Sequence, residues 1–305
     1  MIDSYVIDGW KPKVLVDVMH GSGHGCITTL LGTRGCSVNE LHSDQNPGFG
    51  GIRPEPIECN LGHLRRDMGS SRSPWTIGLA LDGDADRIGA MAPGGKFMSP
   101  QLIFALLLYH LVERRKRRGA IVKTVSTTQM INVIASHHGL PVHETPVGFD
   151  HICEFFGDDN VLMGGEESGS MSIREHIPDG DGILMGLLLV EALCACGTSL
   201  ERLLTDLRDQ VGPFCYARTD NRDESFSKPG LVKQLMMSVP NQIAGFPVDT
   251  VSGLDGVKYV LQDHCWLLIR PSGTEPVLRF YAEAHTDGDV KRLLDAGLDL
   301  VRATN

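Results

Sequence analysis

The sequence lacks a long hydrophobic run and an excess of positive charge. Its longest apolar stretches, 102–112 and 183–196, are too short to span a bilayer. Lysine and arginine total 28 residues against 38 aspartate and glutamate, which gives a net charge of −10. A general nucleic-acid binder needs a basic face, so this charge argues against that class. We therefore expect neither a membrane nor nucleic acid among the partners.

Ordered cysteine motifs are also missing. The eight cysteines are scattered and form no C-x-x-C pair, a pattern typical of reduced packing residues. The first residues lack the basic start and apolar core of a signal peptide, so the expected location is the cytoplasm. The one basic run, 114–118, is interpreted as the solvated C-terminal end of a helix.

The remaining composition is that of a globular protein, with 42% hydrophobic and 22% charged residues. A chain of 305 residues is long enough for two or three domains. Alternating apolar strands and helical patterns predict an α/β fold: two similar α/β domains with mixed, largely parallel sheets, followed by a C-terminal α+β domain. The predicted boundaries are 1–96, 97–212 and 213–305.

The predicted elements follow from these patterns. Strands are expected at 14–19, 36–41, 76–81, 120–125, near 142, 161–163, 215–219, 256–261, 266–270 and 277–284. Helices are expected after 25 to residue 31, at 101–117, 128–138, 151–156, 182–196, 199–211 and 228–238, and from 289 onward.

An acidic loop directly after the strand at 76–81 is the strongest chemical signal. Asp82, Asp84 and Asp86 alternate within Asp82-Gly-Asp-Ala-Asp-Arg87, and three carboxylates so close repel one another unless a cation neutralises them. Carboxylate oxygens suit Mg²⁺, and Arg87 adds a positive charge suited to phosphate. A polar turn that caps a helix and a phosphatase with an aspartate nucleophile remain alternatives. An EF-hand is excluded, because its twelfth position requires glutamate and Pro93 stands there.

Two further loops carry groups that bind sugars or phosphates. In Gly165-Glu-Glu-Ser-Gly169, Glu166 and Ser168 can hydrogen-bond adjacent sugar hydroxyls, although a surface turn also fits. In Arg270-Pro-Ser-Gly-Thr-Glu-Pro276 with Arg279 beyond, the loop offers hydroxyls, backbone N–H groups and two guanidinium groups to a phosphate. A structural loop with a surface Arg–Glu pair is the alternative there.

The turn around Gly21-Ser-Gly23 is not interpreted as a dinucleotide site, because Cys26 stands where a third glycine or alanine is needed. His20 and His24 in the same segment are expected to be turn residues, since no matching histidine or cysteine spacing supports metal ligation.

These three loops, in this order, resemble the motifs of the α-D-phosphohexomutase family, the phosphoglucomutases and phosphomannomutases. Shorter matches run through the chain at 16–21, 54–56, 145–149, 174–178 and 181–182. The resemblance implies a Mg²⁺-dependent enzyme that transfers a phosphoryl group between O1 and O6 of a hexose phosphate. A hexose 1,6-bisphosphate would be its intermediate and activator, and a phosphorylated hexose its partner.

The resemblance also implies a role for each motif residue. Asp82, Asp84 and Asp86 would bind the metal, with Arg87 beside the transferring phosphoryl group and His176 near the sugar. Glu166 and Ser168 would bind sugar hydroxyls. The phosphate that is not transferred would be held by Arg270, Ser272, Gly273, Thr274 and Arg279.

Two departures from the family pattern shape the functional hypotheses. Relatives carry a phosphorylated serine in a first domain, and this chain shows no such serine loop, so we expect family domains two to four and an incomplete mutase. A separate chain could carry the serine domain. Asp150 stands where many relatives have lysine. The alternatives are a non-catalytic phosphosugar-binding protein derived from a mutase and a phosphatase that uses Asp82 as its nucleophile.

Overall fold

The structure is a computed structural model, and it describes residues 1–71, 73–157, 160–222, 230–273 and 275–304. The chain forms two compact units. The first contains Met1–Lys123, Ile134–His143 and Gly148–Gln210, and the second contains Thr124–Val133, Glu144–Val147 and Val211–Asn305. The division into domains 1–96, 97–212 and 213–305 stays a prediction. The two units are defined by contacts between residues, and unit 1 contains most of the first two predicted domains.

The helices and strands have the following bounds. Up to residue 98 they are α1 Ser4–Trp10, β1 Lys13–Asp17, α2 Cys26–Gly32, β2 Ser37–Leu41, η1 Phe49–Gly51, η2 Glu58–Asn60, α3 Gly62–Ser70, β3 Thr76–Leu81, β4 Ile88–Ala92 and β5 Lys96–Met98. From there to residue 211 they are α4 Pro100–Tyr109, the π-helical η3 His110–Arg114, β6 Ala120–Thr124, α5 Met130–His137, β7 Val142–Thr145, α6 Phe149–Cys153, η4 Glu154–Gly157, β8 Val161–Gly165, β9 Met171–Ile173, α7 Gly182–Cys196 and α8 Leu200–Val211. The remainder are β10 Cys215–Asn221, α9 Leu231–Met237, β11 Gln242–Ile243, β12 Phe246–Ser252, β13 Val257–Leu261, η6 Gln262–His264, β14 Trp266–Pro271, β15 Leu278–Ala284 and α10 Asp287–Thr304.

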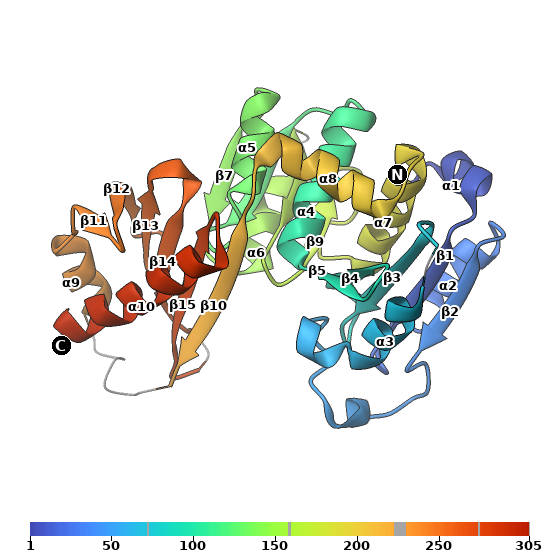
Figure 1. Ribbon diagram of the computed structural model, residues 1–305, viewed down its shortest axis with the longest axis horizontal. Coiled ribbons are helices and arrows are strands. Elements are labelled where there is room, and N and C mark those ends of the chain that lie inside the picture. The colour runs from blue at the N-terminus through green and yellow to red at the C-terminus, as the bar shows by residue number, and fades with distance from the viewer. Residues whose placement is uncertain (72, 158–159, 223–229, 274, 305) are drawn as a thin grey trace. The chain divides into compact units, whose positions relative to one another are not determined.

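The first sheet of unit 1 places the acidic loop. Its strand order is β2-β1-β3-β4-β5 (Figure 1). β2, β1 and β3 are parallel, so their carboxyl ends lie at one edge of the sheet, while β4 and β5 continue it antiparallel. All six residues of β3 are buried, because helices cover both faces of the sheet. Ligand sites of open α/β sheets form at this carboxyl edge.

The helices that cover this sheet bury its apolar residues. α3 packs against β1, β3, β4 and β5, and its Leu64 and Met68 join a core that includes Leu15 and Met91. α7 contacts β3, β4 and α2. Its buried Glu191 accepts the backbone N–H of Asp3, and its Oε1 lies 2.8 Å from Nε2 of buried His110. The N-terminal helix α1 is thereby fixed beside α7.

The second sheet has the order β7-β6-β8-β9. β6 and β8 are parallel and β9 is antiparallel to β8. Ile152 of α6 packs with Val122 and Val161 in the core of this sheet. β8 ends at Gly165, and β9 begins at Met171, so the sequence motif 165–169 forms the turn of this hairpin.

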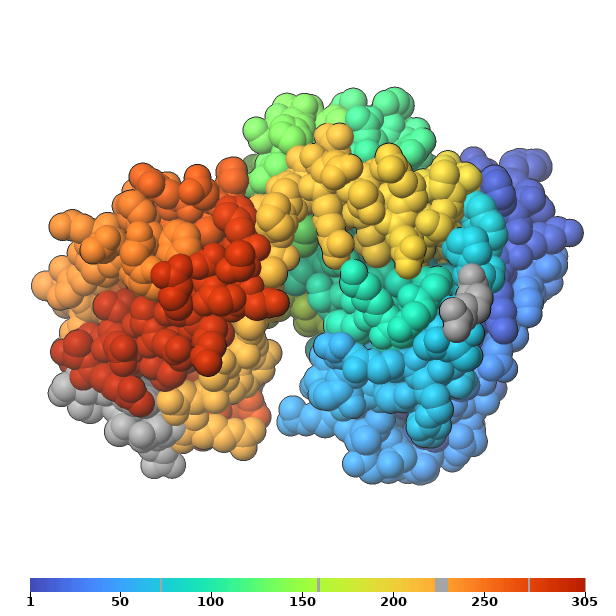
Figure 2. All heavy atoms as spheres, viewed as in Figure 1, coloured from blue at the N-terminus to red at the C-terminus, as the bar shows by residue number. Residues whose placement is uncertain are grey.

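Unit 2 is built on an antiparallel sheet of order β10-β15-β14-β13-β12-β11. α9 and α10 bury one face through a core that includes Leu231, Leu293 and Phe280. Figures 1 and 2 show α10, coloured red, running across the visible face of this unit. On the sheet's other face, Trp266 and Tyr281 pack with Val125 and Val147. Segments 124–133 and 144–147 therefore belong to this unit.

The predicted fold class is confirmed, with two mixed, partly parallel sheets and one antiparallel sheet. Several element predictions were inaccurate. The helix expected at 101–117 is α-helical only to Tyr109 and continues as a π-turn to Arg114. The final helix begins at Asp287, where Thr286 Oγ1 accepts the backbone N–H of Asp289. Helices α1 and α3 and strands β4, β5, β9, β11 and β12 were not predicted.

No single helix within the described ranges is both long and apolar enough to cross a membrane; α7 and α8 meet that criterion only together, with a 90° bend between them.

Candidate functional site

The acidic loop connects two paired strands of unit 1. β3 and β4 form an antiparallel hairpin in which Leu81 pairs with Ile88, so residues 82–87 are held at a fixed turn. Carboxylate oxygens of Asp82, Asp84 and Asp86 all lie within 4.8 Å of one another. Asp82 is 4% exposed. Ala85 adopts φ 64°, a left-handed conformation that few residues with a side chain take.

The electrostatics of this loop fit a divalent cation. Burial and a hydrogen bond with Asp86 raise the pKa of Asp82 to about 8, although a hydrogen bond from the Arg87 backbone N–H opposes the rise. Nε of Arg87 lies 3.6 Å from oxygens of both Asp82 and Asp86. One guanidinium facing three carboxylates leaves excess negative charge, and oxygen ligands are those that Mg²⁺ prefers.

The sugar-motif turn is bound directly to the acidic loop. Ser170 Oγ donates to Asp86 Oδ2 at 2.8 Å, across 84 residues of sequence. Ile88 N–H donates to the Gly169 carbonyl at 3.2 Å, and Arg87 pairs with Ser170 in an isolated antiparallel bridge. Gly182 N–H donates to the Ala85 carbonyl at 2.9 Å. A side chain at Gly182 would place Cβ 2.3 Å from the Arg87 carbonyl oxygen, so only glycine allows this approach.

Glu166 and Ser168 share one hydrogen-bond network. Ser168 Oγ donates to Glu166 Oε2 at 3.1 Å, and Gly148 N–H donates to Glu166 Oε1 at 2.8 Å. Burial, followed by the charge of Glu167, raises the pKa of Glu166. Asp150 is the second residue of α6. It lies in the first turn of that helix, where a negative charge is favourable.

His176 is held by a carboxylate. Its Nε2 lies 2.8 Å from Oδ2 of Asp181, while Asp181 Oδ1 accepts the Leu184 N–H and caps α7. Asp181 thus fixes the helix and the imidazole together. The sequence did not single out Asp181 or Ser170 as site residues, because their partners are known only once the chain is folded.

The phosphate motif forms the turn of the β14–β15 hairpin in unit 2. Arg270 and Arg279 are directly opposite one another in this hairpin, and like charges in such a pair are destabilising unless an anion lies between or beside them. Arg279 donates to Glu275 Oε2 at 3.0 Å. Ser272 N–H donates to the Val277 carbonyl at 2.9 Å, which closes the turn. Gly273 is exposed, and predicted site residue Thr274 lies outside the described residues.

Asp255 is a further residue of this loop region that sequence reasoning missed. Its Oδ2 accepts Arg270 Nε at 2.6 Å and the Val147 backbone N–H at 3.0 Å. One carboxylate therefore orients the guanidinium of a predicted phosphate-binding arginine and fixes the segment 144–147 of the same unit. The roles assigned to the site residues stay predictions; the geometry shows which of them share a network.

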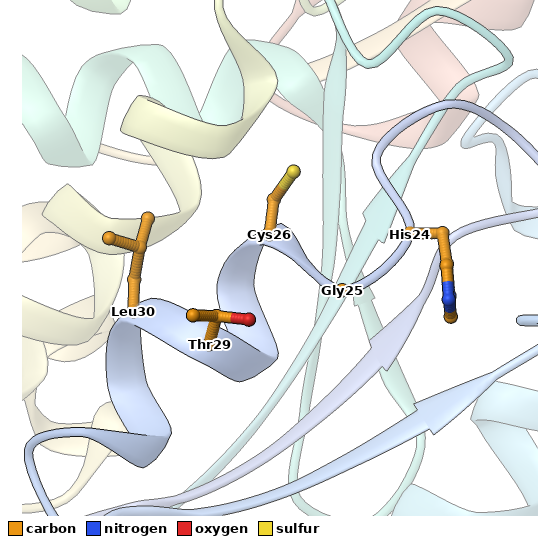
Figure 3. A pocket seen from close by; sticks show the side chains of 5 residues that line it. All are labelled: His24, Gly25, Cys26, Thr29 and Leu30. Carbon is orange, nitrogen blue, oxygen red and sulfur yellow. The ribbon is translucent and has the colours of Figure 1, made fainter.

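An open hollow of about 460 Å³ at the start of α2 is lined by none of the motif residues (Figure 3). It is lined by His24, Gly25, Cys26, Thr29 and Leu30. His24 Nδ1 lies 2.6 Å from Glu40 Oε1. Both His20 and His24 lie in turns, as predicted.

Comparisons with known proteins show the family. The chain matches three models of one family: phosphoglucomutase/phosphomannomutase alpha/beta/alpha domain II at 2–95, alpha/beta/alpha domain III at 99–211, and the C-terminal domain at 233–300. No model of domain I matches.

Individual relatives agree with these matches. The chain is 28% identical to the phosphoglucomutase/phosphomannomutase of Thermococcus kodakarensis over 98% of its length. A solved structure from Thermus thermophilus, provisionally named phosphomannomutase, superposes with a TM-score of 0.85 at 32% identity over 99% of the chain. The chain also shares its fold with N-acetylphosphoglucosamine mutase of Aspergillus fumigatus, whose structure was solved in complex with GlcNAc-6P and magnesium. This match covers 98% of the chain at 18% identity, with a TM-score of 0.66.

The chain covers 63% of the length of each of these three proteins. The three matched models together cover most of its 305 residues, and the acidic, sugar and phosphate motifs lie one in each matched segment. The chain belongs to the phosphoglucomutase/phosphomannomutase family, of which it contains domains II, III and IV.

Proposed function

We propose that this chain provides the metal-, sugar- and phosphate-binding part of a phosphohexomutase. The enzyme would move a phosphoryl group between O1 and O6 of a hexose phosphate by way of a hexose 1,6-bisphosphate. The direct contact between the acidic loop and the sugar-motif turn carries this proposal. Ser170 bonds to Asp86, and Gly169 accepts from Ile88, so cation ligands and sugar-binding groups belong to one hydrogen-bonded assembly.

Mg²⁺ is the proposed cofactor, and Asp82, Asp84 and Asp86 would hold it. When bound, such an ion neutralises charge on the phosphoryl oxygens. Burial and the hydrogen bond with Asp86, which together raise the pKa of Asp82, support this proposal. The presence of magnesium in the structure of the A. fumigatus protein, which has the same fold, supports it further.

The chain's own residues would orient the substrate. Glu166, with its pKa raised by burial, and Ser168 present a carboxyl and a hydroxyl that can bind neighbouring sugar hydroxyls. Arg87 adds positive charge beside the acidic loop. Arg270, with Arg279 opposite it, is suited to bind the phosphate that is not transferred.

The family's phosphorylated serine is proposed to come from outside these 305 residues, from another segment or a separate chain. A coupled assay with glucose 1-phosphate, glucose 1,6-bisphosphate and Mg²⁺ tests this. The 305-residue chain alone should show no sustained mutase turnover. Robust turnover by this chain alone would refute the proposal that the serine comes from outside it. If the chain instead hydrolyses simple phosphate esters, and Asp82→Asn abolishes this hydrolysis, the alternative of a phosphatase with Asp82 as its nucleophile is favoured.

A further inference from the structure

A cluster of one aspartate and two histidines lies at the carboxyl edge of the first sheet. Asp17 is the last residue of β1, His42 directly follows β2, and His63 lies in the first turn of α3. Oδ1 of Asp17 lies 2.8 Å from Nδ1 of His42, and Nε2 of His42 lies 3.0 Å from Nδ1 of His63. All three residues belong to unit 1.

The hydrogen bond with Asp17 defines which nitrogen of His42 faces His63. A carboxylate oxygen accepts, so Asp17 Oδ1 fixes the proton of His42 on Nδ1. Nε2 of His42 then presents its lone pair toward His63. Asp17 itself is 1% exposed, and its Oδ1 also accepts the Met19 N–H at 3.0 Å. This is the arrangement by which a buried carboxylate orients a metal-ligating histidine.

Two further observations indicate that this cluster is more than a packed histidine pair. Oδ2 of Asp17 is buried and accepts no hydrogen bond from the described part of the chain, although burying carboxylate oxygens without partners is costly. His42 adopts φ 50°, a left-handed conformation that residues with a side chain take infrequently.

We propose that His42 and His63 bind a divalent transition-metal ion of the zinc class, with Asp17 as the carboxylate that orients His42. At the tetrahedral angle, Zn–N bonds of about 2.0–2.1 Å place two imidazole nitrogens of one ion roughly 3.3–3.4 Å apart. The 3.0 Å between Nε2 and Nδ1 is slightly shorter, so the exposed His63 ring would move outward a little when the ion binds. The ion would replace the proton shared by the two rings, and open positions would take water.

The site would select a different ion from the acidic loop. Imidazole nitrogens suit Zn²⁺, Ni²⁺ or Cu²⁺, whereas three carboxylates suit Mg²⁺. The ring of His20 lies 5.0 Å from that of His42, but its Nδ1 is already 3.1 Å from the Asp44 carbonyl oxygen, so we assign it a packing role. The proposal does not rest on the proposed mutase function.

Calorimetric titration with ZnCl₂ in excess Mg²⁺, which keeps the acidic loop supplied with its own ion, tests the proposal. We expect one Zn²⁺ per chain, and at least a tenfold loss of affinity in His63→Ala and in His42→Ala. His24→Ala is the matched control, because His24 is also paired with a carboxylate, Glu40. It should bind Zn²⁺ as the original protein does.

Two additional measurements keep the outcome interpretable. With Co²⁺ as the probe, visible absorption typical of nitrogen ligation should appear and should be lost in His63→Ala. His63 is exposed, so its removal takes no side chain from the core. Asp84→Asn should leave Zn²⁺ binding intact. Equal Zn²⁺ affinity in the original protein, His63→Ala and His42→Ala would overturn the proposal, as would binding that is lost only in Asp84→Asn.

Discussion

At Asp82, burial and the neighbouring carboxylate of Asp86 act in the same direction. Both disfavour the charged form, so the pKa is raised to about 8. The unfolded chain would release this proton near the ordinary aspartate value of 3.8. Between these two values the folded state therefore holds a proton that the unfolded state has lost, and stability from this group falls as pH rises.

This linkage gives a prediction for the metal-free protein. In EDTA, the free energy of unfolding of the original protein should fall, relative to that of Asp82→Asn, as the pH rises from about 5 to about 8. Urea unfolding at a series of pH values measures both profiles. Parallel profiles would show that Asp82 does not carry the raised pKa.

A second prediction at the residue scale concerns metal affinity. Because the ion must displace the Asp82 proton, Mg²⁺ affinity should rise by up to about tenfold per pH unit below pH 8 and then level off. Calorimetry in two buffers of different ionisation enthalpy would detect the released proton. Mg²⁺ affinity that is independent of pH from 6 to 8 contradicts this expectation.

At the scale of elements, the start of α7 is packed against the acidic loop through Gly182. A methyl group there would lie 2.3 Å from the Arg87 carbonyl oxygen, and backbone cannot easily move. Gly182→Ala should lower the free energy of unfolding by about 1–3 kcal/mol. Gly62→Ala is the control, because a Cβ at Gly62 meets nothing within 4 Å. Equal urea midpoints for the two variants would refute this account of the contact.

The β14–β15 hairpin gives another prediction at this scale. Asp255→Asn removes the charge that orients Arg270 through the 2.6 Å contact, so affinity for phosphate-bearing ligands should fall about tenfold. Asp299→Asn, which breaks an exposed pair with Arg302 in the same unit, should leave that affinity unchanged. Titration with glucose 1-phosphate compares the two variants. If the two variants lose the same affinity, the loss comes from the changed net charge of the unit and not from the orientation of Arg270.

Local sequence signals account for some elements and not for others. β3 was predicted because its six residues form a continuous buried apolar run. β4 was missed, because Gly89 and Ala90 interrupt any strand-like alternation, and it forms only by pairing with β3. α3 was missed because only Leu64 and Met68 are buried in it. Ser170 and Asp255 could not be found at all, since their partners lie 84 and 108 residues away in sequence.

For the whole molecule, the order of the three motifs was more informative than any one of them. Each loop alone also fitted a structural turn or loop without a ligand, whereas the set predicted the family that the comparisons show. The allocation of 124–133 and 144–147 to unit 2 could not be predicted, because it depends on packing of Val125 and Val147 against Trp266. Helical periodicity at 128–138 predicts a helix. It does not predict which sheet the first residues of that helix contact.

Binding of a phosphorylated hexose by this chain is the central proposal. Calorimetric titration with glucose 1,6-bisphosphate in Mg²⁺ tests it most directly, on the original protein, Glu166→Gln, Arg270→Ala and the control Asp299→Asn. We predict saturable binding that weakens at least tenfold in Glu166→Gln and in Arg270→Ala and persists in Asp299→Asn. No binding by the original protein, or binding that neither site variant weakens, would contradict the claim.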